Sequence, residues 1–103
     1  MRKSEVFFHG IPAGVLEEIQ AGKAYRFLYH TEYAGEPVSL TMPANQPVYK
    51  FDRFPPFFEG VLPEGMQLEA LLKIRKIDRN DLFSQLLAVR ADLVGAATVW
   101  EME

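Results

Sequence analysis

The 103-residue sequence contains no cysteine, which excludes a disulfide framework and any thiolate metal site. Long apolar runs are also missing, since no window approaches the roughly 18 apolar residues of a membrane span. Only three apolar residues in a row follow the charged residues of the N-terminus, too few for the core of a secretion signal. We therefore expect a cytoplasmic protein that does not bind membranes.

Positive charge is scarce as well. The sequence has 11 Lys and Arg residues against 14 Asp and Glu residues, and its formal net charge is −3. Electrostatic binding to nucleic acid needs the opposite excess, so we expect no direct contact with nucleic acid. One small basic cluster is interpreted as a solvated helix end whose charge complements the helix dipole. It consists of Lys73, Arg75, Lys76 and Arg79.

Motifs of catalysis are absent too. The sequence has no glycine-rich phosphate-binding loop and no H-R-D or D-F-G element, so it gives no support for phosphoryl transfer by this chain. Its serines lack a G-x-S-x-G context, and His9 and His30 lack suitably spaced ligands. Glu59 and Glu64 could pair as acid and base, but a helix start also stabilises a carboxylate. We expect no enzyme activity, no cofactor and no bound metal.

What the sequence does contain is the material for one folded domain. Hydrophobic residues make up 49% of the chain and charged residues 24%, which is ordinary for a globular protein. A chain of this length buries roughly two thirds of its unfolded surface around a single core. We therefore assign residues 1–103 to a single domain.

The pattern of residues predicts an α+β fold. Two strands joined by a turn that ends at Gly14 form a hairpin, and alternation of polar and apolar residues predicts a third strand after it. The sheet is small and antiparallel, with an N-terminal meander plus a C-terminal strand. The strands are expected at 3–9, 15–19, 25–29, 38–42 and 94–100.

About three short helices complete the predicted fold. The first, at 57–62, follows two prolines that fit a first helical turn. The second starts at Glu64, and apolar spacing predicts an amphipathic helix with Leu68, Leu71 and Leu72 on one face. Asp78 is the expected N-cap of the third helix. The apolar stripe of that helix is formed by Leu82, Phe83, Leu86 and Leu87.

The most informative segment is Phe57-Phe58-Glu59-Gly60-Val61-Leu62-Pro63-Glu64-Gly65. Its aromatics need burial, whereas its glycines and proline interrupt a continuous helix. The segment resembles the FF-x-G-LLPEG motif in the N-terminal subdomain of HipA-like serine/threonine kinases, the toxin kinases of bacterial toxin–antitoxin operons. Residues 37–43 are similar to that family's PLSLSLP run, and 81–97 to its next helix and D-x-x-G-A segment. The resemblance covers nearly the whole chain but only the front part of such a kinase.

This resemblance implies a function. The HipA N-terminal subdomain packs against its own catalytic domain, so a free copy is expected to bind and inhibit a HipT-like or HipA-like kinase toxin. In this respect the chain is similar to the small HipS-like antitoxins of tripartite HipBST systems. The resemblance also implies a HipB-like helix-turn-helix protein as a further member of the complex. The alternative is that the chain is a non-catalytic N-terminal fragment of a longer HipA-like kinase.

Partner binding is assigned to the motif and to the residue after it. The aromatic pair has two interpretations, since most aromatics of a small domain are buried, whereas aromatics and Met are also enriched at interface centres. Met66 likewise belongs either to the interface or to the apolar face of the second helix. The predicted partner-binding residues are Phe57, Phe58, Glu59, Leu62, Pro63, Glu64, Gly65 and Met66.

Overall fold

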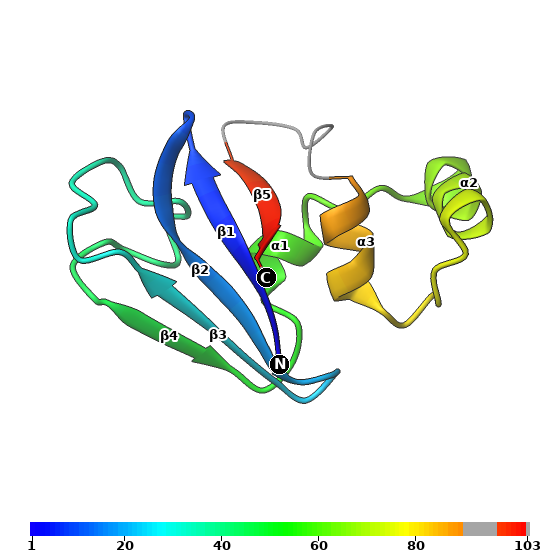
Figure 1. Ribbon diagram of the computed structural model, residues 1–103, viewed down its shortest axis with the longest axis horizontal. Coiled ribbons are helices and arrows are strands. Elements are labelled where there is room, and N and C mark those ends of the chain that lie inside the picture. The colour runs from blue at the N-terminus through cyan, green and yellow to red at the C-terminus, as the bar shows by residue number, and fades with distance from the viewer. Residues whose placement is uncertain (90–96, 103) are drawn as a thin grey trace.

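The computed structural model describes residues 1–89 and 97–102, and this part of the chain forms a five-stranded antiparallel sheet with three short helices (Figure 1). The strand order is β4-β3-β2-β1-β5, so the C-terminal strand lies beside the N-terminal one. The predicted α+β class, with a meander and an added last strand, is confirmed. The elements are β1 (Arg2–Phe8), β2 (Ile11–Gln20), β3 (Ala24–Tyr29), β4 (Val48–Phe51), α1 (Pro56–Glu59), α2 (Gly65–Arg75), α3 (Leu82–Ala88) and β5 (Ala97–Met102). Residues 94–96 of the last predicted strand lie outside the described residues.

The first hairpin turns in two residues. Only His9 and Gly10 separate β1 from β2, and both have positive φ, 53° and 78°. A pair of such residues forms the turn whose twist matches that of the flanking strands. The longer turn expected to end at Gly14 is therefore wrong, because residues 11–14 already belong to β2.

Pro12 and Gly14 resemble turn residues but have roles in the sheet. Pro12 lies where an irregularity between Val6 and Phe7 shifts the β1–β2 register, and such a bulge tolerates proline. A Cβ atom on Gly14 would lie 2.3 Å from the carbonyl oxygen of Leu28, so only glycine lets β3 approach this closely. Neighbouring strands, which the local sequence does not show, thus explain both residues.

The strand expected at 38–42 is not formed. These residues make a tight turn closed by an isolated bridge between Ser39 and Met42. The fourth strand is instead β4, which pairs with β3 through four residue pairs. Val38 and Met42 are buried, so the apolar residues of this stretch anchor a turn in the core and do not form a strand.

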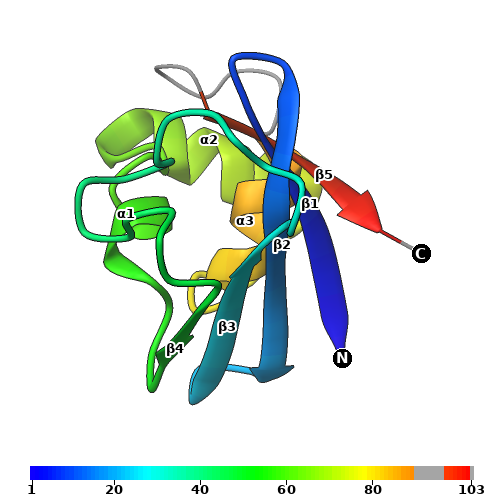
Figure 2. The same ribbon diagram turned by 90° about the vertical axis from the view of Figure 1, so that its left-hand side faces the viewer.

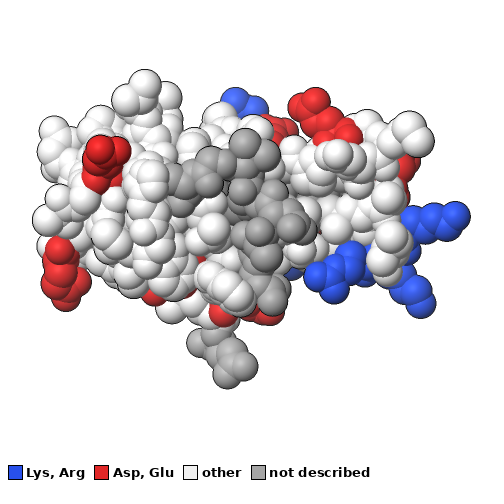
Figure 3. All heavy atoms as spheres, turned by 90° about the horizontal axis from the view of Figure 1, so that it is seen from above, with Lys and Arg blue, Asp and Glu red and all other residues white. Residues whose placement is uncertain are grey.

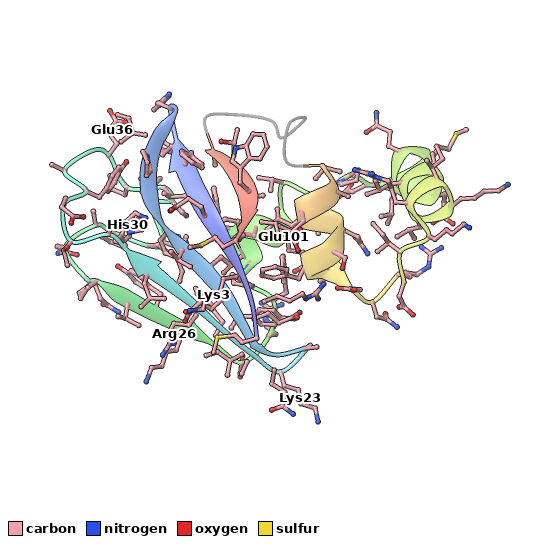
Figure 4. All side chains as sticks on the ribbon, viewed as in Figure 1. Lys3, Lys23, Arg26, His30, Glu36 and Glu101 are labelled. Atoms are coloured by element: carbon pink, nitrogen blue, oxygen red, sulfur yellow. The ribbon has the colours of Figure 1, made fainter. Side chains whose placement is uncertain are left out.

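Helices cover one face of the sheet, and the core lies between the two layers (Figure 2). On the opposite face, Glu17 is buried between two cations, which Figure 4 labels. Lys3 Nζ lies 3.3 Å from the Glu17 carboxylate, and Arg26 Nε donates to it at 2.6 Å. The largest fully buried side chains of the core include Phe27, Phe58, Phe83, Leu16, Met42 and Leu86.

Arg2 fixes α3 to the sheet. Its guanidinium donates to Glu18 Oε1 at 2.7 Å, to Asp81 Oδ1 at 2.8 Å and to Ser84 Oγ at 2.6 Å. It also lies 4.9 Å from the centre of the Phe83 ring. Hydrogen bonds between ionised groups are stronger than neutral ones, and the bond to Glu18 is the main reason why the pKa of Arg2 is raised above its usual value. The network joins β1 and β2 to α3.

The N-cap of α3 is Asp81, not the expected Asp78. The Asp81 carboxylate accepts a hydrogen bond from the Ser84 backbone N–H at 3.1 Å. Burial alone would raise the pKa of Asp81, but hydrogen bonds from Arg2 and Ser84 outweigh it, so this pKa lies below its ordinary value. Asp78 instead accepts from the Asn80 backbone N–H at 2.7 Å, in the turn before the helix.

Candidate partner-binding site

The segment from α1 to the start of α2 is shaped by proline and glycine. Pro56 begins α1, which ends after one turn at Glu59. Turn hydrogen bonds continue to Leu62, whose backbone N–H donates to the Glu59 carbonyl oxygen at 3.2 Å. Gly65 then begins α2 with a φ of 58°, a conformation that favours glycine. The helix predicted at 57–62 is present, but its α-helical part is shorter and is followed by a tight loop.

The two aromatics of the segment have different environments. Phe58 is fully buried, and its ring centre lies 5.9 Å from that of Phe27 in β3. Phe57 is half-buried and packs edge to face on Phe58, with ring centres 5.0 Å apart. Phe58 is therefore a core residue that holds α1 on the sheet, whereas part of Phe57 remains accessible.

α2 lies at the far end of the molecule from the sheet (Figure 1) and has no fully buried side chain. Leu68, Leu71 and Leu72 are only half-buried, Ile74 is exposed, and Met66 exposes 89% of its surface. The expected helix is present, but its apolar residues do not enter the core formed by the described residues. A helix of 11 residues is marginal in water by itself, so a surface that covered these residues would stabilise it.

An open groove of about 970 Å³ lies between the motif loop, α2 and the end of α3. Val61, Leu62 and Pro63 form its wall on the loop side, and Leu71 and Val89 contribute from the helical side. All five side chains are half-buried. The groove is thus lined mainly by apolar groups and has room for several apolar side chains.

The α2 end also carries exposed charge. Figure 3 shows Lys and Arg side chains gathered at this end of the molecule. Lys73 and Arg75 lie in the last turn of α2, where they complement the helix dipole. Arg79 pairs with Glu69 at 2.7 Å, and its hydrogen bond lowers the pKa of the Glu69 carboxyl group. The geometry agrees with the interpretation of the basic cluster as a solvated helix end.

The predicted partner-binding residues form one continuous segment, and the structure separates them by exposure. Leu62, Pro63 and Glu64 line the groove, and Met66 points away from the core beside it. Glu59 and Gly65 are exposed, and the positive φ of Gly65 shapes the loop, whereas Phe58 is buried beneath the segment. Their contact with a partner stays a prediction. The groove residues Val61, Leu71 and Val89 were not predicted, because isolated apolar residues resemble core residues in a sequence.

Other candidate sites have little support in the described residues. His30 Nε2 lies 2.6 Å from Glu5 Oε2 on the sheet, and His9 is exposed in the first hairpin turn. Among residues 1–89 and 97–102, no group of three His, Cys, Asp or Glu side chains is arranged to hold a metal ion. No helix in these ranges is long and apolar enough to cross a membrane.

Comparison with known proteins identifies the fold. Residues 4–100 match the family model of the HipA N-terminal domain. A solved structure of the N-terminal domain of HipA toxin is 30% identical, with a TM-score of 0.78, and the match covers 100% of this chain and 94% of the other. An uncharacterized protein of Haemophilus influenzae is 32% identical over 101 residues, which cover 98% of this chain and 93% of that protein. The chain therefore belongs to the HipA N-terminal domain family.

Proposed function

We propose that this chain is an antitoxin that binds and inhibits a HipT-like or HipA-like serine/threonine kinase. The observation that carries the proposal is a HipA N-terminal domain whose apolar groove and α2 residues are left uncovered by the described part of the chain. In a HipA-like kinase the corresponding subdomain packs against the catalytic domain. A free domain that keeps the complementary surface is able to bind such a kinase in trans.

The length of the Haemophilus influenzae relative supports a stand-alone role. The match covers 93% of that protein, which leaves no room in it for a kinase domain. The alternative, a non-catalytic N-terminal fragment of a longer HipA-like kinase, predicts instead that the coding sequence continues in frame into a kinase domain.

The proposed contact surface is the motif loop with the start of α2. Met66 is its apolar anchor, because a protruding Met adapts to an apolar pocket. Leu62 and Pro63 supply the groove wall, and the exposed Glu64 carboxylate faces a polar group of the partner. The accessible part of Phe57 adds aromatic area.

The remaining motif residues act at the edge of this surface or beneath it. Phe58 holds α1 on the sheet, and Gly65 gives the loop its shape. Glu59 lies exposed at the end of α1. Substitutions at Phe58 or Gly65 should therefore affect binding through the fold of the segment, whereas substitutions at Met66 should act directly.

Inhibition requires only that the complex favour an inactive kinase arrangement or fill its cleft. This chain needs no catalytic group or cofactor for that. We place the complex in the bacterial cytoplasm, with a HipB-like helix-turn-helix protein as a further member that contacts DNA in place of this chain.

Co-expression with the cognate kinase followed by size-exclusion chromatography tests the proposal. A standard interface buries about 800 Å² on each partner, and such a complex persists at micromolar concentration. We expect a single peak that contains both proteins at equal stoichiometry. Separate elution at micromolar concentration would reject the antitoxin function.

A further inference from the structure

The loop between β3 and β4 presents Leu40 to solvent. The Leu40 side chain exposes 96% of its surface, more than that of any other large hydrophobic residue described. Val38 and Met42, two residues before and after it, are both buried. The chain thus leaves the core and returns to it over residues 38–42, with Leu40 at the tip.

Tyr29 holds both ends of this turn. Its hydroxyl accepts a hydrogen bond from the Val38 backbone N–H at 2.9 Å and donates one to the Met42 carbonyl oxygen at 2.5 Å. Burial raises the pKa of Tyr29 above its ordinary value of 10.0, which favours the protonated hydroxyl. Ser39 closes the turn by accepting from the Met42 backbone N–H at 3.0 Å, and its Oγ accepts from Thr41 at 3.2 Å. Binding through such a fixed turn loses little backbone entropy.

The turn lies on the same side of the sheet as the candidate partner-binding site. Figure 2 shows the loop after β3 on the side of the sheet where α1 lies. Val38 and Met42 belong to the same core cluster as Phe58 of α1. A partner that contacts both the motif loop and the Leu40 turn would thus extend along this one side of the sheet.

The loop around Leu40 is acidic. Residues 31–49 contain Glu32 and Glu36 but no Lys or Arg, and both carboxylates are exposed. Figure 4 shows Glu36 at the outer end of this loop. A surface complementary to it would combine an apolar pocket for one leucine with Lys or Arg at the rim.

We propose that the Leu40 turn is a second anchor for the partner kinase, which receives Leu40 in an apolar pocket bordered by basic residues. This inference rests on the proposed function, because it takes the same kinase as the partner. It adds a contact remote in sequence from the motif loop, presented by the clamp between Tyr29 and residues 38–42.

Calorimetric titration with the purified cognate kinase tests this anchor. Leu40→Ser should weaken binding roughly tenfold, as expected for loss of one apolar anchor. Its melting temperature should stay near that of the wild type, since an exposed side chain contributes little to stability. The matched control is Ile11→Ser, at an exposed apolar residue of β2 outside both surfaces, and it should leave affinity unchanged.

Tyr29→Phe tests the clamp while Leu40 stays in place. Removing the hydroxyl takes away its hydrogen bonds to Val38 and Met42 and loosens the turn, so binding should weaken severalfold while the protein remains folded. If Leu40→Ser binds the kinase with wild-type affinity, Leu40 is not an anchor. An equal loss of affinity in Ile11→Ser would also contradict the proposal, because the effect would then not be specific to Leu40. If Leu40→Ser instead abolishes self-association of this chain and leaves kinase binding intact, Leu40 contacts a second copy of the chain, and the proposal is refuted. Failure of the wild type to bind the kinase would instead reject the proposed function.

Discussion

The Met66→Asp substitution tests whether Met66 is an interface residue or a core residue. Because Met66 exposes 89% of its surface in the first turn of α2, its replacement removes little packing, and Asp is favourable near a helix start. The free energy of unfolding should therefore change by less than about 0.5 kcal/mol. In the complex, the substitution removes an apolar anchor and desolvates a carboxylate. We expect binding to weaken by about 1 to 3 kcal/mol, or roughly 5- to 150-fold in Kd.

Two measurements on the same samples give the answer. Thermal melting reports stability, and titration against kinase activity reports inhibition. Ile11→Asp introduces the same charge at an exposed apolar residue away from the motif and should alter neither quantity much. A melting temperature lowered by many degrees would show that Met66 supports the fold. Unchanged inhibition together with an unchanged melting temperature would remove Met66 from the interface and contradict its role as an anchor.

Further predictions concern the core, the α3 cap and the absence of nucleotide binding. Phe58→Ala should lower the free energy of unfolding by about 3 to 5 kcal/mol in urea titrations because the ring is fully buried, and Phe57→Ala should cost clearly less. Since the pKa of Asp81 is lowered on folding, its stabilisation is present above the ordinary value of 3.8 and is lost as the pH falls through the folded pKa. Asp81→Asn should therefore lose less stability than the wild type upon acidification, as measured by urea unfolding at neutral and acidic pH. Calorimetry with Mg-ATP should show no binding, and a low-micromolar dissociation constant would contradict the expectation that this chain does not bind nucleotide.

Periodicity predicted the elements whose packing is local in sequence. Tyr25, Phe27 and Tyr29 alternate in β3, and all three are buried on its inner face. The apolar stripe of α3 places Phe83 and Leu86 in the core. In each case one side of the element meets the core, so the pattern of side chains directly reflects burial.

Long-range contacts explain what the sequence did not reveal. β4 is four residues long and exists because it pairs with β3, a partner that no local pattern specifies. Residues 38–42 have the composition of a strand, yet the Tyr29 hydroxyl binds both ends of the segment and holds it as a turn. The Arg2 network was invisible for the same reason, since Glu18 and Asp81 are distant from Arg2 in sequence.

The candidate site was only partly predictable. Its motif identified the segment from α1 to α2, but residue types could not decide which side chains are exposed. Met66 and Leu68 both fit an apolar helical face, and only the position of α2, away from the sheet, leaves Met66 in solvent. Val89, at the end of α3, also lines the groove, and only the tertiary fold brings it next to the motif loop.

The most direct test of the proposed antitoxin function is a titration of the purified chain into its active cognate kinase, with phosphoryl transfer as the readout. Kinase activity should fall in proportion to the added chain and reach its minimum near equimolar concentration. Met66→Asp and Leu40→Ser should each require more protein for the same inhibition. Full kinase activity in the presence of a several-fold excess of folded wild-type chain would contradict the proposed antitoxin function.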